Sequence, residues 1–283
     1  MQPAEAKGVI PASKINSNSH DTFAKRRNIM SDLFDLNGKV ALVTGGAGGL
    51  GSAIAVALAE AGADVAIADL KLDSADEVSS QIKAKGKKTI TVSVDVTKEQ
   101  SVADMVKKVM DEFAHIDILV TAHGLAIRKP ADTFPVEEWQ KVMDVNTRGV
   151  FIVCQAVGRE MLKQKSGRIV NLSSVRGRYG LPSNYAAYCA SKGAVDTLTR
   201  TLACEWAKSN ITVNAIGPTI VETDLTRTAL QDPAYAAQMK ARIPMGRWAQ
   251  PDDIVGPVVF FASEAAKFVT GQVLYIDGGV TTW

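Results

Sequence analysis

Residues 40–51 read Val40-Ala41-Leu42-Val43-Thr44-Gly45-Gly46-Ala47-Gly48-Gly49-Leu50-Gly51, and an alanine-rich segment follows them up to residue 61. An apolar run, a glycine cluster and an alanine-rich segment in this order predict a buried strand, a tight turn and a helix. Glycine lets such a turn adopt positive φ and lets the backbone approach a pyrophosphate, to which the helix N-terminus offers free N–H groups. The stretch therefore predicts a dinucleotide-binding turn, although a plain glycine-rich connection is the alternative.

Two sets of glycines fit such a turn. Gly46, Gly48 and Gly51 form the pattern G-x-G-x-x-G, whereas Gly45, Gly49 and Gly51 form G-x-x-x-G-x-G. Both patterns place glycine where a strand passes into a helix, so the sequence leaves the choice between them open.

The acidic residue Asp69 ends the next strand-like run, 18 residues after Gly51. A carboxylate at this position accepts both hydroxyls of an adenosine ribose and repels a 2′-phosphate. The glycine turn contains no Lys or Arg that would bind that phosphate, although Lys71 follows two residues after Asp69. We therefore expect NAD as the cofactor, with NADP less favoured; the other interpretation of Asp69 is a solubilising acid at a strand end.

Short β-rich runs and helical patterns alternate over residues 36–283. Strand-like runs cover Val40–Val43, Asp64–Ala68, Thr89–Val94, Ile116–Val120, Arg168–Leu172, Thr212–Ile216 and Gln272–Ile276, and helical patterns include Gly51–Ala61, Ser101–Phe113, Glu137–Lys163 and Tyr188–Ala207. Most of the strand-like runs are almost continuously apolar, as in a parallel sheet that helices cover on both faces. The alternation predicts a single α/β domain, a Rossmann-type doubly wound fold with a seven-stranded parallel sheet.

Two segments stand outside this alternation. Residues 1–35 are polar and basic without apolar periodicity, which predicts a disordered N-terminal arm, with a transit peptide as the alternative. Residues 222–247 form a long insertion after the sixth strand, which predicts a lid over the substrate, a helical cap on the sheet being the simpler interpretation.

The composition disfavours several classes of function. The 283 residues are 46% hydrophobic and 22% charged with a net charge of +2, so neither nucleic acid nor a membrane is expected as a partner. No apolar run reaches the roughly 20 residues that span a bilayer. The three cysteines are odd in number and lack zinc-site spacing. We expect no metal site, and reduced cysteines in a cytoplasmic protein.

Tyr188 and Lys192 stand four residues apart in a helical pattern, which places both side chains on one face of a helix. A free phenol titrates near pH 10, too high for a base at neutral pH. An ammonium about 4 Å away, at an effective dielectric of about 20, would favour the phenolate by on the order of 4 kcal/mol. We therefore expect Lys192 to lower the pKa of Tyr188 into the range that acid–base catalysis requires.

Together these motifs resemble the short-chain dehydrogenase/reductase family over essentially all of residues 36–283. The matching motifs are the glycine turn, Asp95-Val96, Val145-Asn146-x-x-Gly149, Asn171-Leu172-Ser173-Ser174, Tyr188-x-x-x-Lys192 and Ile276-Asp277-Gly278-Gly279. The cofactor site that we expect, from Asp69 and from this resemblance, consists of Thr44, Gly45, Gly49, Leu50, Gly51, Asp69, Asp95, Val96, Gly124, Tyr188, Lys192, Pro218 and Thr223.

The resemblance also implies an oxidoreductase that interconverts a secondary alcohol and a ketone with a catalytic set of Ser174, Tyr188, Lys192 and Asn146. Tyr188 as phenolate takes the hydroxyl proton while hydride passes to the nicotinamide, and Ser174 orients the same oxygen. Lys192 lowers the tyrosine pKa and holds the nicotinamide ribose, and Asn146 links Lys192 to solvent through water. A homotetramer is the implied assembly.

Three departures from the family pattern matter. Thr121-Ala122-His123-Gly124 replaces Asn-Asn-Ala-Gly, which puts sheet-bracing hydrogen bonds in doubt, and we expect His123 to be structural or at the cofactor edge. Pro218-Thr219 replaces Pro-Gly, which makes the nicotinamide contacts through Thr223 less secure. Ser174 also lies one residue further from Tyr188 than is commonest, which implies a longer loop.

Arginines follow the fourth and fifth predicted strands at their carboxyl ends, where the loops of this fold face the substrate. Arginine binds a carboxylate by paired hydrogen bonds, so Arg128, Arg176 and Arg178 are candidate ligands of an acidic substrate; solvated loop charges are the alternative. Tyr185 is followed four residues later by Cys189 rather than by a lysine, and we expect it to line the pocket.

Residues 33–40, 125–129 and 244–248 resemble the branch of the family that acts on sugar acids and polyols, such as gluconate 5-dehydrogenase. A 3-oxoacyl thioester reductase is an alternative that would favour NADPH, and Asp69 argues against it. A catalytically silent, cofactor-binding sensor is another, against which stand the retained Ser174, Tyr188 and Lys192. A nucleotide-binding interaction module that uses the basic arm fits poorly with a nearly neutral chain.

Overall fold

The computed structural model describes residues 32–180, 184–223, 226–227 and 231–282. Contacts divide the chain into two units, Met1–Leu33 and Phe34–Trp283, and the fold below is that of the second unit. Most of the predicted arm, residues 1–31, lies outside the described residues, as do residues 224–225 and 228–230 of the predicted lid.

Seven parallel strands form one sheet in the order β3-β2-β1-β4-β5-β6-β7. The strands are β1 (Val40–Thr44), β2 (Asp64–Asp69), β3 (Thr89–Ser93), β4 (Ile118–Thr121), β5 (Gly167–Leu172), β6 (Ile211–Pro218) and β7 (Val273–Ile276). These bounds differ from the predicted ones by at most two residues, and the predicted doubly wound, seven-stranded parallel sheet is confirmed. The strand order reverses between β1 and β4, and ligands of such sheets bind beyond the carboxyl ends at that point.

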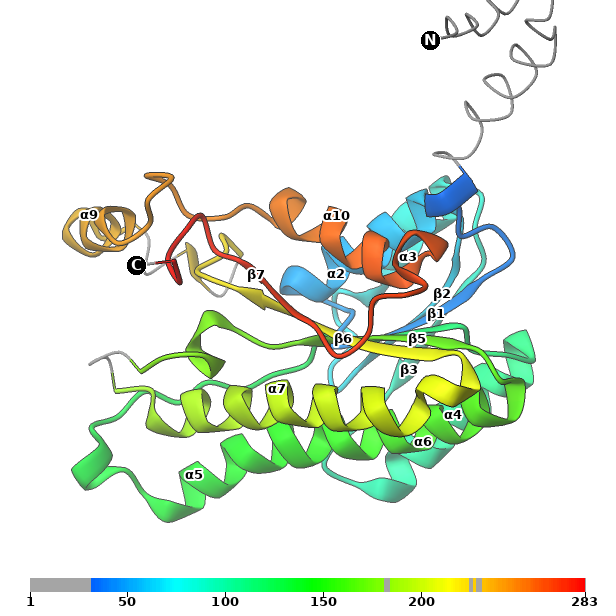
Figure 1. Cartoon of the computed structure of the whole chain (residues 1–283), viewed down its shortest axis with the longest axis horizontal. Coiled ribbons are helices and arrows are strands. Elements are labelled where there is room, and N and C mark those ends of the chain that lie inside the picture. The colour runs from blue at the N-terminus through cyan, green and yellow to red at the C-terminus, as the bar shows by residue number, and fades with distance from the viewer. Residues whose placement is uncertain (1–31, 181–183, 224–225, 228–230, 283) are drawn as a thin grey trace, which may run out of the picture. The chain divides into compact units, whose positions relative to one another are not determined.

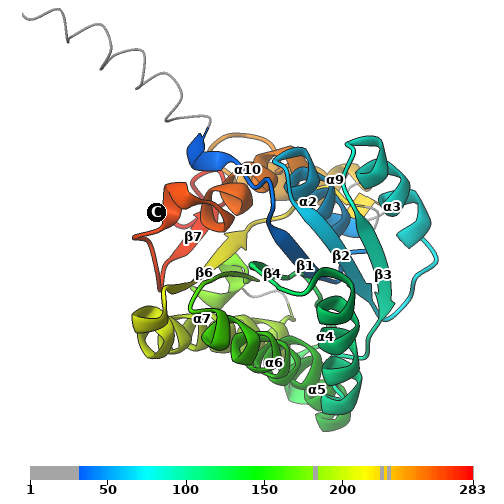
Figure 2. The ribbon, with the colours of Figure 1, turned by 90° about the vertical axis from the view of Figure 1, so that its right-hand side faces the viewer.

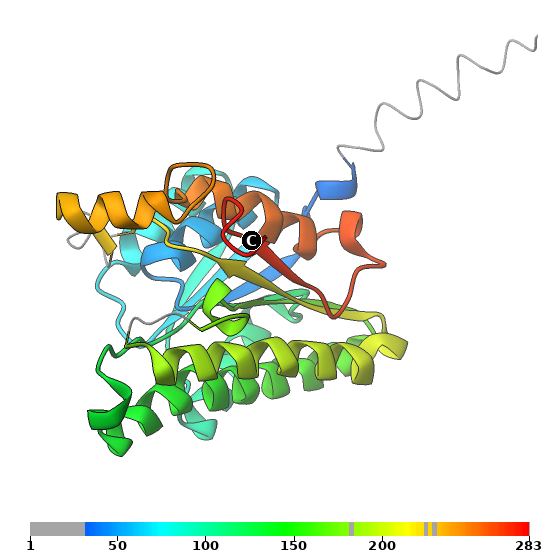
Figure 3. The same cartoon turned by 60° about the vertical axis from the view of Figure 1, so that its left-hand side comes forward.

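Helices cover both faces of the sheet, with α2, α3 and α10 on one face and α4, α6 and α7 on the other (Figures 1 and 2). The helices are α2 (Gly49–Glu60), α3 (Ala75–Ala84), α4 (Glu99–Phe113), α5 (Val136–Met143), α6 (Gly149–Gln164), α7 (Ala186–Trp206), α9 (Pro233–Ala241) and α10 (Pro251–Ala262). Two clusters of buried apolar side chains, one between each helix layer and the sheet, form the core. Helix α9 lies beyond the carboxyl end of β6 (Figure 3).

The helical pattern over Glu137–Lys163 is not one regular helix. A π-helical turn, η3 (Asp144–Arg148), separates α5 from α6. Such a turn adds one residue to the helical repeat and is common at functional sites. It carries Asn146, whose side chain is fully buried, toward the loop that follows β4.

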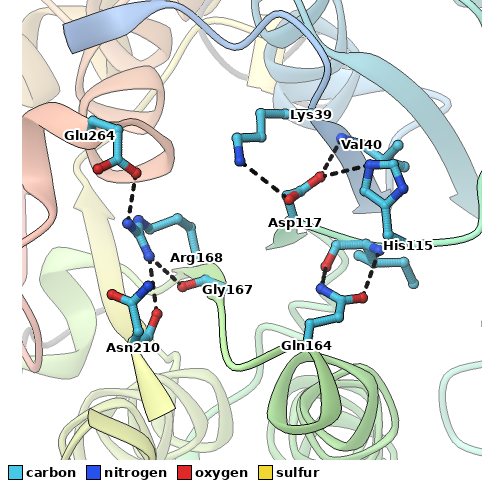
Figure 4. Close-up of polar contacts among 10 residues, drawn as sticks. Lys39, Val40, His115, Asp117, Gln164, Gly167, Arg168, Asn210 and Glu264 are labelled. Carbon is cyan, nitrogen blue, oxygen red and sulfur yellow. Dashed lines mark hydrogen bonds and ion pairs between the residues drawn. The ribbon is translucent and has the colours of Figure 1, made fainter. Parts of the chain in front are cut away.

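Polar pairs tie the strands together at the amino ends of β1, β4 and β5 (Figure 4). Asp117, next to β4, accepts a hydrogen bond from the backbone N–H of Val40 in β1 at 2.9 Å and pairs with His115 at 3.2 Å. On the neighbouring strand β5, Arg168 donates to Glu264 at 2.9 Å. The charges at the amino ends of these strands are therefore used in structural contacts, whereas the carboxyl ends open into a cavity.

In the described part of the chain, no helix is long and apolar enough to cross a membrane. Helix α7, with 21 residues, carries Lys192 and Asp196 in its middle. The cysteines Cys154, Cys189 and Cys204 are all free thiols.

Candidate active site

A cavity of about 1010 Å³ opens at the carboxyl ends of the strands. It is lined by the glycine turn, by residues at the ends of β2 to β6, and by parts of the segment between β6 and α10. The predicted site residues that line it are Gly45, Gly49, Leu50, Gly51, Asp69, Asp95, Val96, Gly124, Arg128, Ser174, Arg176, Tyr185, Tyr188, Lys192, Pro218 and Thr223. The predicted residues Thr44, Asn146 and Arg178 do not line it.

The backbone resolves the choice between the two glycine patterns. Gly45 and Gly49 have φ of +73° and +55°, whereas Gly46 and Gly48 do not have positive φ. A Cβ on Gly45 would lie 2.5 Å from the backbone nitrogen of His123, because the turn after β1 packs against the chain that leaves β4. The turn therefore uses Gly45, Gly49 and Gly51.

The glycine turn fits the pyrophosphate of a dinucleotide. Gly48 and Gly49 line the cavity, and a Cβ on either would meet no protein atom within 4 Å, so their missing side chains leave space for a ligand. Helix α2 starts there without a side-chain cap, so its first N–H groups remain available.

Two carboxylates mark the side of the cavity next to β2 and β3. Asp69 accepts hydrogen bonds from the backbone N–H of Ala47 at 3.1 Å and of Leu70 at 2.7 Å, which fixes it beside the glycine turn. The hydrogen bond from the Thr97 hydroxyl, at 2.6 Å, is the largest cause that lowers the pKa of Asp95, although burial opposes it. Both groups are acceptors on the side where an adenosine would lie.

The proposed acid–base pair comes from α7 and meets a serine from the end of β5. The Nζ atom of Lys192 lies over the ring of Tyr188, 5.7 Å from its centroid. Ser174 forms a hydrogen bond with the Tyr188 phenol, and its Oγ also accepts from the backbone N–H of Arg176 at 3.2 Å. The structure thus brings Ser174, Tyr188 and Lys192 together in one cavity.

The expected lowering of the Tyr188 pKa by Lys192 is wrong for this structure. Burial raises the pKa of Tyr188, while the hydrogen bond with Ser174 and the charge of Arg176 oppose that rise. The ammonium of Lys192 faces the ring and donates to the carbonyl of Leu172 at 2.6 Å. Burial lowers the pKa of Lys192 itself to about 8, and the charge of Asp196 opposes this.

Asn146 hydrogen-bonds the loop after β4, which forms part of the cavity wall. Its Oδ1 accepts from the backbone N–H of Leu125 at 2.7 Å, and its Nδ2 donates to the Leu125 carbonyl at 2.8 Å and to Ser191 at 3.0 Å. A Cβ on Gly124 would lie 3.6 Å from Asn146 Oδ1 and 3.9 Å from Lys192 Nζ. Asn146 and Lys192 therefore both lie next to Gly124, and the side chain of Asn146 holds the loop after β4.

The bracing that the sequence put in doubt is made by other side chains. Thr44 and His123 Nδ1 are 2.7 Å apart and join the ends of β1 and β4. Thr121 donates to Asn171 on β5 at 2.8 Å, and Asn171 donates to Thr199 on α7 at 3.0 Å.

His123 itself is neutral at ordinary pH. Burial, and then the charge of Lys192, lower its pKa to about 3. An imidazole that does not gain a proton above that pH suits the predicted structural position rather than acid–base work.

The predicted arginines separate into two groups. Arg128 and Arg176 line the cavity and lie over the ring of Tyr185, 5.6 and 4.9 Å from its centroid. Arg178 is exposed and lies 5.3 Å from the ring centroid of Tyr275, outside the cavity lining. The interpretation of Arg178 as a substrate ligand is therefore not supported by its position, because the turn after Ser174 directs it toward β7.

Sequence reasoning missed one cationic residue of the cavity. Arg242 follows α9 and lines the cavity with Met239 and Ile243. Its signal was its place in the predicted lid, but no local pattern distinguishes it from the other charges of that segment. Within the described ranges, no three His, Cys, Asp or Glu side chains are grouped so as to hold a metal ion.

Comparison with known proteins identifies the family. A family model described as enoyl-(acyl carrier protein) reductase matches residues 45–281. A 2-dehydro-3-deoxy-D-gluconate 5-dehydrogenase of Pseudoalteromonas atlantica is 41% identical over 255 residues, which are 88% of this chain and 98% of that protein. An NAD-dependent glycerol dehydrogenase of Listeria innocua is 40% identical over 248 residues, 88% of this chain and 96% of that one.

A solved structure shares the architecture as well. It is a gluconate 5-dehydrogenase from Burkholderia cenocepacia in complex with NADP and tartrate, with a TM-score of 0.86 and 37% identity over 90% of this chain and 99% of that chain. The structural similarity, the matching family model and the alignment over nearly the whole length of the relatives agree with one another. The chain is a nicotinamide-dependent oxidoreductase and belongs to the short-chain dehydrogenase/reductase family.

Proposed function

We propose that this protein is an NAD(H)-dependent dehydrogenase that interconverts a secondary alcohol and a ketone on a sugar acid or polyol. The observation that carries the proposal is the convergence of Ser174, Tyr188 and Lys192 on a cavity that also contains the glycine turn and Asp69. Relatives named for a sugar acid and for glycerol support the substrate class.

The preference for NAD rests on Asp69. Its carboxylate is held at the cavity wall by two backbone N–H groups, where it accepts ribose hydroxyls and repels a 2′-phosphate. Lys71 also lines the cavity, and a solved relative holds NADP, so the ratio of the two activities is the quantity to measure.

The bound nicotinamide supplies the hydride acceptor for oxidation and the hydride donor for reduction. Tyr188 exchanges the proton of the substrate oxygen, and Ser174 holds that oxygen by a hydrogen bond so that the proton transfer is short. Lys192 contributes a positive charge beside the phenol and the cofactor ribose. Asn146 fixes the loop at Gly124 and, as we propose from the family resemblance, orders a water that connects Lys192 to solvent.

Three cations support an acidic substrate. Arg128 and Arg176 are held beside Tyr185, and Arg242 reaches the same cavity from the segment after α9. The acidic residues in the cavity lining, Asp69 and Asp95, are on the cofactor side. We propose that these arginines bind the carboxylate of a sugar acid by charge-assisted hydrogen bonds.

The test is NADH absorbance at 340 nm with the purified chain, against sugar acids, neutral polyols and a 3-oxoacyl thioester, with Tyr188→Phe in parallel. We expect NAD-linked turnover of a sugar acid or polyol that falls roughly 10²- to 10⁴-fold in Tyr188→Phe, while NADH binding persists. Turnover of the thioester alone with NADPH would assign the chain to acyl reduction. NADH binding without turnover of any compound would favour a cofactor-binding sensor.

We further propose the homotetramer that the family resemblance implies. Light scattering coupled to gel filtration tests it, because four copies of a chain of 30.1 kDa have about four times that mass in solution. A monomer or dimer mass under assay conditions would exclude the tetramer.

A further inference from the structure

One buried carboxylate near the catalytic pair has no part in the mechanism above. Asp196 lies one helical turn after Lys192 on α7 and is 3% exposed. Its Oδ1 accepts from the hydroxyl of Ser173, and its Oδ2 accepts from the hydroxyl of Tyr275 at 2.9 Å. A buried carboxylate is costly unless it is hydrogen-bonded or paired, and this one is bonded to elements that meet at the active site.

The carboxylate joins the end of β5 to α7. Ser173 directly precedes the proposed catalytic Ser174, and its hydroxyl also lies 3.4 Å from the backbone oxygen of Lys192. The turn η4 (Val175–Gly177) crosses α7 at the same place: a Cβ on Gly177 would lie 2.9 Å from Asp196 Oδ2 and from the Lys192 carbonyl. Asp196 therefore holds the serine-bearing turn against the helix that carries the tyrosine and the lysine.

The charge of Asp196 also acts on Lys192. The ammonium donates to the carbonyl of Leu172, which has no net charge, and burial disfavours its protonated form. Of the other titratable groups near it, His123 is neutral and Tyr188 is a phenol. Asp196 is thus the group that favours the ammonium.

Burial raises the pKa of Asp196, and its polar surroundings oppose that rise. Ser173 and Tyr275 donate to it, and the charges of Arg200 and Lys192 act in the same direction. Arg178 covers the ring of Tyr275. Burial, and then the hydrogen bond to Asp196, raise the pKa of Tyr275 to about 12, so Tyr275 remains a donor over the pH range of an assay.

We propose that Asp196 is a positioning residue of the catalytic centre, which fixes the Ser173–Ser174 turn against α7 and places a carboxylate one helical turn from Lys192 on the same face of that helix. The inference rests on the proposed dehydrogenase function. In this proposal Arg178 packs over the ring of Tyr275, which belongs to the buried network around Asp196, and does not bind substrate.

The first experiment measures kcat for ketone reduction against pH in wild type and in Asp196→Asn, which keeps the shape of the side chain and removes its charge. Loss of an opposite charge lowers the pKa of an ammonium, so we expect the alkaline limb of the profile to move down by about one pH unit. The matched control is Asp104→Asn, an exposed acid on α4 that bonds Gln100, and its alkaline limb stays at the wild-type position.

The second experiment separates position from charge. Ser173→Ala removes the hydroxyl that ties the serine-bearing turn to Asp196 and leaves the carboxylate in place. We expect kcat to fall roughly tenfold at every pH without a shift of the alkaline limb, because misplacement of a catalytic group costs rate. Circular dichroism checks that each variant is folded; if Asp196→Asn does not fold, Ser173→Ala decides the positioning on its own.

Two results overturn the inference. An alkaline limb of Asp196→Asn at the wild-type pH excludes the effect on Lys192, and a wild-type kcat in Ser173→Ala excludes the positioning of Ser174. Absence of turnover in the wild-type chain would instead refute the proposed function, because that assay does not involve Asp196. In that case the pH dependence of the Lys192 ¹³Cε resonance, compared between wild type and Asp196→Asn, tests the charge effect without activity.

Discussion

Replacement of Gly51 by alanine tests whether the glycine turn is shaped by protein packing or by ligand space. A Cβ on Gly51 would lie 2.0 Å from the carbonyl oxygen of Gly45 and 2.8 Å from its carbon. Close carbon–oxygen contacts in proteins are about 3.3 Å, so the two backbones must separate by about 1.3 Å. Overpacking of this kind costs about 1–3 kcal/mol, of which the better helix propensity of alanine returns about 0.5–1 kcal/mol.

A net loss of about 0.5–2 kcal/mol lowers Tm by roughly 1–8 °C in a domain of this size. We expect Gly51→Ala to show this loss in thermal unfolding without cofactor, and to weaken NADH binding, measured by NADH fluorescence, at least tenfold. The control is Gly48→Ala, whose Cβ meets no protein atom within 4 Å but enters the cavity.

The control separates two causes. Gly48→Ala is expected to keep the cofactor-free Tm and lose NADH affinity alone, because its methyl group occupies ligand space rather than protein space. A Gly51→Ala variant with wild-type Tm and wild-type NADH affinity would refute the packing argument. A Gly48→Ala variant with wild-type affinity would place the pyrophosphate elsewhere.

Asp69→Ala is expected to lower the ratio of kcat/KM with NAD to that with NADP at least tenfold, whereas Asp64→Ala, at the other end of β2, leaves that ratio unchanged. A ratio that is unchanged in both variants would remove Asp69 from cofactor selection. Arg242→Gln is expected to raise KM for a sugar acid roughly 10- to 100-fold, the value of a hydrogen bond to a charged group. The same variant should leave KM for a neutral polyol unchanged, and the control Lys267→Gln should change neither KM. An equal effect of Arg242→Gln on both substrates would contradict carboxylate binding. Arg247 lowers the pKa of Asp253 from 3.8 to about 2, so the stability from this pair is complete above pH 3.8 and lost as the pH falls toward 2. The difference in urea midpoint between wild type and Asp253→Asn should therefore disappear between about pH 4 and pH 2, and a difference that persists at pH 2 would contradict the pairing.

The elements predicted best are the strands, in which most residues are buried against a helix layer. Strands such as β1 and β5 are buried throughout because helices cover both sheet faces, and their largely apolar composition is visible without a structure. The helix predicted over Glu137–Lys163 was right in extent but not in regularity, because the π-helical turn at Asn146 depends on hydrogen bonds to Leu125, 21 residues away.

Side-chain direction set the limit for the candidate site. Arg176 and Arg178 stand two residues apart, and only the turn after Ser174 sends one to Tyr185 in the cavity and the other to Tyr275 on β7. The effect of Lys192 on Tyr188 was likewise predicted from spacing alone, whereas the ammonium faces the ring and burial governs the pKa of the phenol.

By itself the sequence determined the alternation of strands and helices, the place of the glycine turn and the Tyr188–Lys192 spacing, because these depend on neighbours within about one helical turn or one strand. Only the tertiary structure decided which glycines the turn uses, where Arg242 and Arg178 point, and that Asp196 meets Ser173 and Tyr275. Those features depend on contacts between strands, helices and turns that are far apart in the chain. Tertiary packing, rather than the local sequence pattern, determines which of these elements meet.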